Sequence, residues 1–332
     1  MERRTFLASC FLCAASARAG IAAESVGIRR LAILHPSAPS TSMTGDGSPV
    51  FRILFRHLEK SGYVEGRNLV VDRYAPLGSK QSLRAMILAA TETKPDAILA
   101  VSGKTVSHLK RLTATIPIIG VMSDPVAYGL VTSLSHPGGN VTGCVVDPGI
   151  DIWVKRLSIL KEAVPGVSKV FYVAPDTTWT TAVGLGVKAA AATTGIQIVG
   201  PAVEDPFQED QYRKAFADLS ERPDAVLVSS AAENRSFGKL IVNLVQELRL
   251  PAMYPYGEYV TEGGLMAHDV DVADLWLHAA EEVVEILNGA KPGDIPIYQP
   301  RHFRFVINAG AARSIGLDLS PSIVAMADEI ID

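Results

Sequence analysis

Short runs rich in Ile, Val and Leu alternate with helical stretches along most of this chain. Such runs are typical of strands buried on both faces of a parallel sheet, and parallel strands need helical crossovers between them. We expect a first set of strands at 31–35, 69–74, 97–101, 116–122 and 141–146, and a second set at 170–174, 196–203, 225–229 and 252–254. The alternation therefore predicts an α/β fold in which a doubly wound parallel sheet is built twice.

The last quarter of the chain follows a different pattern. Expected strands at 265–268 and 295–298 flank an expected helix at 272–288. A further strand at 303–307 begins a unit that ends in a helix after Pro321. These additional elements could complete both sheets, which requires the chain to cross between two lobes more than once.

The first 23 residues have the parts of an export signal peptide. Arg3 and Arg4 form a charged start, an apolar run covers 6–17, and small residues permit cleavage after Ala19 or after Ala23. The apolar run is too short to span a bilayer as a helix. The segment predicts that the mature protein works outside the cytoplasm, in the periplasm.

Two details of this segment leave alternatives open. The paired arginines and the weakly apolar core also suit a twin-arginine signal, which exports folded protein. The sequence from Leu7 to Cys10 has the form of a lipoprotein acylation site, which would anchor the protein to the membrane. Only 5–9 would then form the apolar core, which is too short, so we expect a cleaved signal rather than an anchor at Cys10.

Charge and cysteine content exclude several classes of function. Cleavage removes Glu2 and three arginines, so the net charge changes from −4 to −6, and an acidic chain is a poor partner for nucleic acid. Cleavage also removes Cys10 and Cys13 and leaves Cys144 alone, which permits neither an internal disulfide nor a thiolate cluster. Histidines such as His108 and His268 have no metal-ligand spacing. We expect no nucleic-acid partner, no metal and no cofactor.

The candidate site lies in the loops that follow the expected strands. In a parallel sheet, ligands collect outside the carboxyl ends of the strands, where helix N-termini direct backbone N–H groups at them. These loops are rich in hydroxyl groups and also carry charged and aromatic side chains. The candidate ligand-binding residues are Ser37, Ser102, Lys104, Thr105, Ser123 and Asp124 in the first lobe, and Asp176, Trp179, Ser230, Tyr256 and Glu258 in the second.

Several of these candidates also have a purely structural interpretation. Ser102, Thr105 and Asp124 stand where helix N-caps belong, and capping alone accounts for such residues. In the functional interpretation, Lys104 binds an anionic group of a ligand, and Asp124 or Glu258 binds a cationic group. A hydroxyl can serve both purposes, so the two interpretations do not exclude each other.

No set of residues predicts catalysis. The chain has no nucleophile elbow, phosphate loop or activated cysteine. The stretch 184–189 fits the dinucleotide pattern GxGxxA, but such a loop must follow its strand directly, and 175–183 intervene. We interpret the stretch as a helix with small residues at a close contact, and we expect that the chain is not an enzyme.

Short motifs in a specific order give the chain a resemblance to a known family. The chain resembles the ABC transporter substrate-binding proteins with a type 1 periplasmic-binding fold, the group that includes TrpX-like tryptophan-binding proteins. The resemblance runs from about Arg30 to the C-terminus, and its motifs are 62–68, 116–118, 124–126, 137–143, 155–157, 161–165, 263–266 and 327–330.

This resemblance implies two Rossmann-like lobes joined by a three-strand hinge, with a solute bound between them and handed to an ABC permease in the inner membrane. It divides the chain into a signal peptide at 1–23, a first lobe at 28–146 plus 264–301, and a second lobe at 147–263 plus 302–332. We also expect a monomer.

The resemblance also implies where the ligand binds. In family members the ligand meets the loops after the first, third and fourth strands and their counterparts, which here include Ser37, Ser102, Thr105, Asp124, Asp176 and Tyr256. The loops at 102–105 and 229–232 depart from the family pattern, so the identity of the ligand does not carry over. The prediction is a receptor for a small carboxylate or amino-acid-like solute, with an aromatic side chain as one alternative.

Two other classes of function stay open. A ligand-sensing repressor domain shares this two-lobed fold, but it would need a basic helix-turn-helix where the export signal stands. An exported α/β enzyme acting on a small molecule would be indicated if alanine at Ser102 or Asp124 abolished a measurable reaction.

Overall fold

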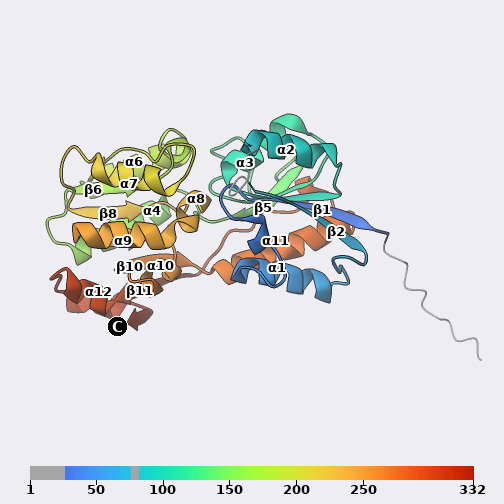
Figure 1. The fold of residues 1–332 in the computed structure, drawn as a ribbon. Helices are drawn as coiled ribbons and strands as arrows, with labels where there is room; N and C mark the ends of the chain where they lie inside the picture. Colours follow the sequence, from blue (N-terminus) through green and yellow to red (C-terminus); the bar gives the residue numbers. More distant parts are fainter. Residues whose placement is uncertain (1–26, 76–81) are drawn as a thin grey trace, which may run out of the picture.

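The computed structural model describes residues 27–75 and 82–332, which form two lobes side by side (Figure 1). The predicted signal peptide, including Cys10, lies outside the described residues. Each lobe consists of a sheet with helices on both faces, as the alternation of strands and helices predicted. In the described part of the chain, the helices are too short or too polar to cross a membrane.

Lobe 1 contains a five-stranded parallel sheet in the order β2-β1-β3-β4-β5. Helices α1 and α11 pack together on one face, and α2 and α3 cover the other (Figure 1). The central strands are buried at every residue, because helices cover both faces of the sheet. The elements of this lobe are β1 (Arg29–Leu34), η1 (Ser40–Ser42), α1 (Pro49–Lys60), β2 (Leu69–Tyr74), α2 (Leu83–Glu92), β3 (Ala97–Val101), α3 (Gly103–Leu112), β4 (Ile118–Met122), β5 (Val141–Val145), α11 (Val272–Leu287) and η2 (Pro292–Asp294).

Lobe 2 contains a seven-stranded sheet in the order β12-β11-β10-β9-β8-β6-β7. All neighbouring strands are parallel except β10 and β11. Helices α4 and α6 pack together on one face, and α7 and α9 pack on the other. The elements of this lobe are α4 (Asp151–Ala163), β6 (Lys169–Val173), α5 (Asp176–Trp179), α6 (Ala182–Thr194), β7 (Gln197–Val199), α7 (Glu209–Ala217), β8 (Ala225–Val228), α8 (Ala232–Ser236), α9 (Gly238–Leu248), β9 (Ala252–Tyr254), α10 (Gly257–Thr261), β10 (Met266–Val270), β11 (Phe303–Asn308), α12 (Ala309–Ser314), α13 (Pro321–Met326) and β12 (Glu329–Ile331).

Differences from the predicted strands are largest at the edges of the sheets. Residues 196–203 form the short β7 and then a single bridge between Val203 and Pro175. Residues 295–298 form only a bridge from Tyr298 to the end of β5. The edge strand β12 was not predicted, because its residues are mostly exposed and its pairing with β11 does not require an apolar pattern.

The structure also tests the helix with the GxGxxA pattern. Gly184 lies in α6, and a Cβ atom at this position would stand 2.4 Å from the carbonyl oxygens of Thr178 and Trp179. A Cβ atom at Gly186 would meet nothing within 4 Å. The predicted close contact is therefore confirmed at Gly184 and wrong at Gly186.

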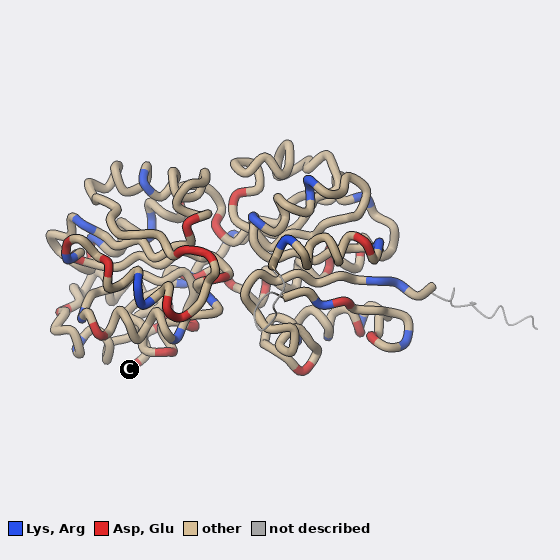
Figure 2. The backbone as a smooth tube through the Cα atoms, turned by 45° about the horizontal axis from the view of Figure 1, so that its top comes forward, with Lys and Arg blue, Asp and Glu red and all other residues tan. Residues whose placement is uncertain are grey.

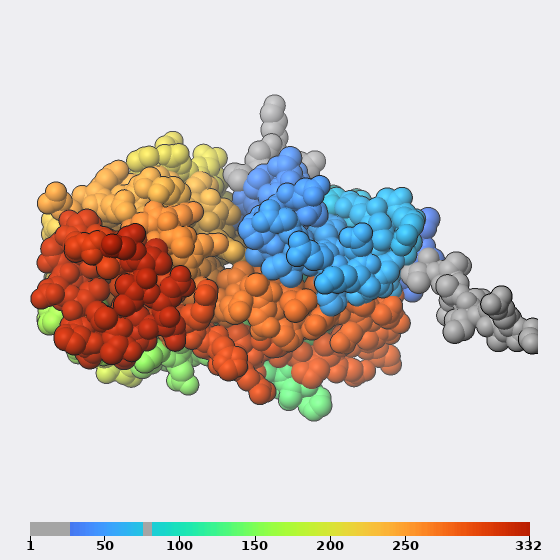
Figure 3. Space-filling view, turned by 90° about the horizontal axis from the view of Figure 1, so that it is seen from below, coloured from blue at the N-terminus to red at the C-terminus, as the bar shows by residue number. Residues whose placement is uncertain are grey.

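The chain passes between the lobes three times. It leaves β5 for α4 of lobe 2, returns from β10 to α11, and leaves lobe 1 again after Tyr298 to form β11. Figure 3 shows the result on the surface, where orange residues of α11 lie beside the blue residues of α1, and the red C-terminal residues belong to lobe 2. The three connections, at 146–150, at Asp271 and at 299–302, form the hinge.

One domain boundary predicted from the sequence is wrong. The segment that begins at 264 was assigned to lobe 1, but β10 pairs with β9 and β11 in the sheet of lobe 2. The chain therefore returns to lobe 1 at Asp271. An apolar strand pattern predicts burial but does not specify which of two sheets receives the strand.

A buried ion pair ties the hinge to lobe 2. Asp147, in the first connection, accepts a hydrogen bond from Nη1 of Arg156 at 2.8 Å, and the two side chains are 2% and 0% exposed. Arg156 also donates from Nε and Nη2 to the carbonyl oxygen of His268, at 3.3 and 3.2 Å, in the strand that precedes the second connection. The other carboxylate oxygen of Asp147 accepts a hydrogen bond from Ser230. One cation thus holds two of the three connections.

We expect Asp147→Ala to lower the free energy of unfolding by about 3–5 kcal/mol, because the Arg156 cation stays buried without its partner. Urea unfolding followed by circular dichroism measures the change. The control is Glu209→Ala, which breaks the exposed pair between Glu209 and Arg213 and should hardly move the midpoint. Equal effects of the two variants would contradict the role assigned to the buried pair.

Candidate functional site

A cavity of about 610 Å³ lies between the two lobes, at the carboxyl ends of the parallel strands. Its walls come from the loops after β1, β3 and β4 of lobe 1 and after β6, β8 and β9 of lobe 2, together with the starts of α1 and α11. Ligands of doubly wound sheets bind at this end of the strands. The volume is also typical of small-molecule sites.

Seven of the eleven residues predicted from the sequence line this cavity. They come from post-strand loops of both lobes, so the fold brings the hydroxyl-rich loops to one place. The seven are Ser37, Ser102, Lys104, Ser123, Ser230, Tyr256 and Glu258.

Thr105 and Asp124 do not line the cavity; Thr105 is buried in the first turn of α3, whose N-cap is Ser102, and Asp124 caps a turn. Thr105 is fully buried, and its hydroxyl forms a hydrogen bond with that of Ser102 at 3.2 Å. Asp124 Oδ1 accepts a hydrogen bond from the backbone N–H of Ala127 at 3.0 Å. For these two residues the structural interpretation describes the side chain better than the functional one.

Asp176 and Trp179 also lie outside the cavity wall. Asp176 accepts a hydrogen bond from the backbone N–H of Thr177 at 2.6 Å, and the Trp179 ring packs on Tyr172 with centroids 5.5 Å apart. Threonine residues of the same loop, within 177–181, line the cavity instead. Sequence reasoning identified this loop but not the side chains that face inward, because the short helix α5 decides which way each one points.

Several cavity residues were missed by sequence reasoning. Glu233, Arg235 and Ser236 lie on α8, whose five residues are too few to show a periodic pattern. Trp276 lies in the first turns of α11, and His35 directly follows β1. One feature of the sequence could have identified His35 and the charged residues of α8 as cavity residues: they directly follow strands β1 and β8.

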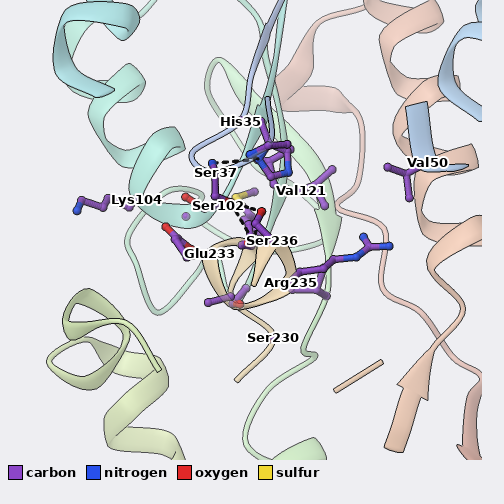
Figure 4. Close-up of a pocket in the computed structure, with 18 of the residues that line it drawn as sticks. His35, Ser37, Val50, Ser102, Lys104, Val121, Ser230, Glu233, Arg235 and Ser236 are labelled. Carbon is purple, nitrogen blue, oxygen red and sulfur yellow. Dashed lines mark hydrogen bonds between the residues drawn. The ribbon is translucent and has the colours of Figure 1, made fainter. Parts of the chain in front are cut away.

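Side chains of the two lobes touch at the cavity. Ser37 Oγ donates a hydrogen bond to the carbonyl oxygen of Ala232 at 3.0 Å, and Ser236 Oγ donates to Ser37 Oγ at 2.7 Å (Figure 4). The hydroxyl groups of Tyr128 and Thr181 form a further bond at 2.8 Å. These contacts join lobe 1 to lobe 2 directly, so the structure has the lobes closed on one another.

Lys104 and Glu258, the two predicted charged residues in the wall, already have partners. Lys104 Nζ lies 3.5 Å from Asp205 Oδ2 of lobe 2. Glu258 accepts two hydrogen bonds from Arg235, one of them from Nη2 at 3.1 Å. In this arrangement neither Lys104 nor Glu258 can bind a ligand group without sharing or losing its partner.

Ser102 has an unusual backbone conformation at the start of α3. Its φ angle is +78°, which L side chains rarely adopt and which glycine would adopt without strain. Its Oγ accepts a hydrogen bond from the backbone N–H of Thr105 at 3.3 Å while the residue lines the cavity. The same residue therefore caps α3 and lines the cavity.

His35 stands in the cavity wall as a neutral imidazole. Burial, together with the nearby charge of Arg235, lowers the pKa of His35 to about 3. Its Nδ1 accepts a hydrogen bond from the backbone N–H of Ala38 at 2.9 Å, so the ring proton resides on Nε2. The ring therefore contributes an uncharged N–H donor.

The cavity wall has an apolar part and a polar part. Val50, Phe51, Leu275 and Trp276 supply apolar surface, and the rings of Phe51 and Trp276 meet edge to face with centroids 5.0 Å apart. The loops at 102–108 and 177–181 supply hydroxyl groups. A small molecule with both an apolar body and polar groups suits such a wall.

The titratable side chains of the described residues form no metal-ligand cluster, and the thiol of Cys144 is buried. Within 27–75 and 82–332, no group of three or more His, Cys, Asp or Glu side chains is placed to hold a metal ion. Cys144 is buried, its Sγ donates to the carbonyl oxygen of Leu275 at 3.5 Å, and burial raises the pKa of the thiol well above its usual value. Such a thiol is inert, so the site offers hydrogen bonds, charges and apolar surface for binding.

Comparison with known proteins places the chain among transport proteins. The sequence profile of the ABC transporter substrate binding protein family matches residues 53–331. The tyrosine-binding protein of Clostridioides difficile (strain R20291) is 24% identical over 296 residues, which cover 89% of this chain and 81% of that protein.

Two crystal structures share the fold. A conserved domain protein from Vibrio cholerae O1 biovar El Tor has a TM-score of 0.78 and 23% identity, with 91% of this chain and 99% of that chain covered. An ABC domain in complex with L-Trp from Streptococcus pneumonia has a TM-score of 0.72 and 21% identity, with 91% and 100% covered. Their similarity extends across both lobes.

We expect the free energy of unfolding to fall as the pH drops from about 6.5 toward 3, in part because of His35. Its pKa of about 3 in the folded state lies below the ordinary value of 6.5, so the unfolded state binds the proton first and acid favours unfolding. His268, whose pKa burial lowers to about 4, adds to the same trend.

The variant His35→Asn keeps a hydrogen-bond acceptor near the position of Nδ1 and removes the titrating group. Urea unfolding across this pH range should show a weaker pH dependence in the variant, and an unchanged dependence would contradict the neutral imidazole.

Proposed function

Because the chain belongs to the ABC transporter substrate-binding protein family, we propose that it is the receptor that captures a small solute and delivers it to an ABC permease in the inner membrane. The observation that carries this proposal is the cavity of about 610 Å³ whose walls come from both lobes. A solute held there contacts both lobes at once, which couples binding to their relative position.

The receptor works by hinge closure in this proposal. The contacts of Ser37 with Ala232 and of Tyr128 with Thr181 can form only when the lobes approach each other. A solute must favour the closed state by about 5.5 kcal/mol to move the equilibrium from 1:99 to 99:1. A wrong solute leaves buried hydroxyl groups without partners, and that penalty supplies selectivity.

The proposed solute is amino-acid-like, with a carboxylate and an aromatic or other apolar side chain. The names of the relatives support this class, since one is a tyrosine-binding protein and another was solved with L-Trp. The apolar wall at Phe51 and Trp276 suits the side chain. The start of α3, where Gly103 and Lys104 line the cavity, suits a carboxylate because the first backbone N–H groups of a helix lack internal partners.

We propose binding without catalysis. Two histidines, His35 and His108, line the cavity, and the Nδ1 atom of each bonds to a backbone group, Ala38 N–H and the Lys104 carbonyl oxygen respectively, rather than to a nucleophilic hydroxyl. A repressor-type sensor shares the two-lobed fold, and the export signal predicted from the sequence argues against that class. We also propose that the mature protein is a monomer that works in the periplasm.

Thermal-shift measurements with amino acids, aromatic acids and small carboxylates should identify at least one compound that stabilises the protein. A ligand at 100 times its Kd stabilises by about 2.7 kcal/mol. Ser123→Trp should remove this stabilisation because the indole occupies the solute's space, whereas Ser61→Trp, at an exposed site outside the cavity, should leave it unchanged. No stabilising compound, together with turnover of some substrate by the pure protein, would contradict the receptor proposal.

Export is testable through the N-terminus of the mature protein. In a bacterial host with a periplasm, sequencing of the periplasmic form should find a start at Gly20 or Glu24. Arg3→Lys combined with Arg4→Lys separates the two export routes: the precursor stays in the cytoplasm if the twin-arginine route is used, which needs the arginine pair, and is still exported if the general route is used. The native chain fused to an unrelated cleavable signal serves as the control. A mature form lipidated at Cys10 would contradict the cleaved signal.

A further inference from the structure

Glu233 is a buried carboxylate in the cavity wall. It lies on α8, is 4% exposed, and lines the cavity. Among the described residues, no other side chain forms a hydrogen bond or ion pair with it, and the polar contact that it makes is with its own backbone N–H. Burial raises the pKa of Glu233 above its usual value, which reflects the cost of holding this charge away from water.

The charges around Glu233 do not balance it. Lys104 is the cation that acts on it, and the carboxylates of Asp205 and Asp176 act in the opposite direction. Lys104 is paired with Asp205 and extends away from Glu233 (Figure 4). The one cation acting on Glu233 is therefore paired with another carboxylate, while two carboxylates oppose the charge of Glu233. Figure 2 shows several Asp and Glu positions gathered where the two lobes meet.

Arg235, on the same helix, does not compensate Glu233. The two side chains leave α8 in different directions (Figure 4). Arg235 forms a two-point ion pair with Glu258 and lies over the ring of Tyr256, with its guanidinium carbon 5.2 Å from the ring centroid. Arg235 is therefore already paired with Glu258 and makes no ion pair with Glu233 among the described residues.

We propose that Glu233 binds a cationic group of the solute, so that the receptor selects ligands that carry an amine and rejects the same molecules without it. This inference rests on the proposed receptor function and deepens it, because it names the group that distinguishes an amino acid from a plain carboxylate or a sugar. The geometry assigns this role to Glu233 rather than to Asp124, which caps a turn, or Glu258, which holds Arg235.

Selectivity follows from the cost of an unpaired buried charge. A solute with an ammonium group pairs with Glu233 in the closed cavity and relieves the desolvation of the carboxylate. A solute of the same shape without that group leaves Glu233 buried and unpaired, and removing one partner of a buried charged pair is costly. The discrimination therefore acts at closure, when water is excluded from the cavity.

The first test compares matched ligands on the native protein. Isothermal titration calorimetry is carried out with L-tyrosine and L-tryptophan, with their deaminated analogues 3-(4-hydroxyphenyl)propionate and indole-3-propionate, and with tyramine and tryptamine. At least one of the two amino acids should bind at least about 10-fold more tightly than its deaminated analogue, because only the amino acid pairs with Glu233.

The second test uses Glu233→Gln, which keeps the shape of the side chain and removes its charge. Affinity for the amino acid should fall by at least about 10-fold, and the preference over the deaminated analogue should disappear. Glu247→Gln, at an exposed position of α9, is the matched control and should bind like the native protein. Because the carboxylate lacks a side-chain partner, the variant should also unfold at the same or a higher temperature than the native protein.

The outcomes separate this inference from the proposed function. If the deaminated analogues bind as tightly as the amino acids, or if Glu233→Gln keeps the native preference, Glu233 is not the anchor, although the receptor function stands. If neither these compounds nor those of the wider thermal-shift screen bind, both proposals fail. If the variant does not fold, the comparison of matched ligands on the native protein decides alone.

Discussion

The buried pair of Arg156 and Asp147 is the interaction on which the geometry of the hinge and the cavity depends. Arg156 belongs to α4 of lobe 2, while Asp147 lies in the first connection between the lobes. The same guanidinium holds the carbonyl oxygen of His268, close to the second connection. Through Ser230, which donates to Asp147 and lines the cavity, the network reaches the candidate site. Separating a buried cation from these partners costs about 3–5 kcal/mol of free energy. Lobe 2, two connections and one cavity wall therefore keep their relative positions.

The two lobes supply different kinds of side chains to the site. On lobe 1, Ser37 and Ser102 carry hydroxyl groups in loops that follow β1 and β3, and Ser102 does so with an unfavourable φ angle. On lobe 2, the short helix α8 carries both Glu233 and Arg235 into the cavity. Closure joins these surfaces through a few direct hydrogen bonds. A solute then adds the contacts that neither lobe makes alone, which is the physical basis of a binding-driven hinge.

The general location of the site was predictable from the sequence, and its details were only partly so. Loops after parallel strands had to meet at one edge of each sheet, and Ser37, Ser102, Ser230 and Tyr256 do line the cavity. Thr105 followed the same rule and yet is buried, because successive residues of a helix are rotated by about 100° and the turn of α3 carries its side chain into the core. The sequence did not predict Glu233 as a site residue, because a helix of five residues is too short to show which of its faces is buried.

The sequence by itself determined the α/β class, the alternation of buried strands with helices and the division into two lobes, because these follow from hydrophobic patterning within short segments. Only the tertiary structure decided that β10 belongs to lobe 2, that Lys104 and Glu258 have partners, and that Glu233 is buried with no side-chain partner among residues 27–75 and 82–332. Those features depend on which side chains from distant segments meet, and no local pattern contains that information. The sequence shows which residues are charged, whereas the fold decides which of these charges have a partner.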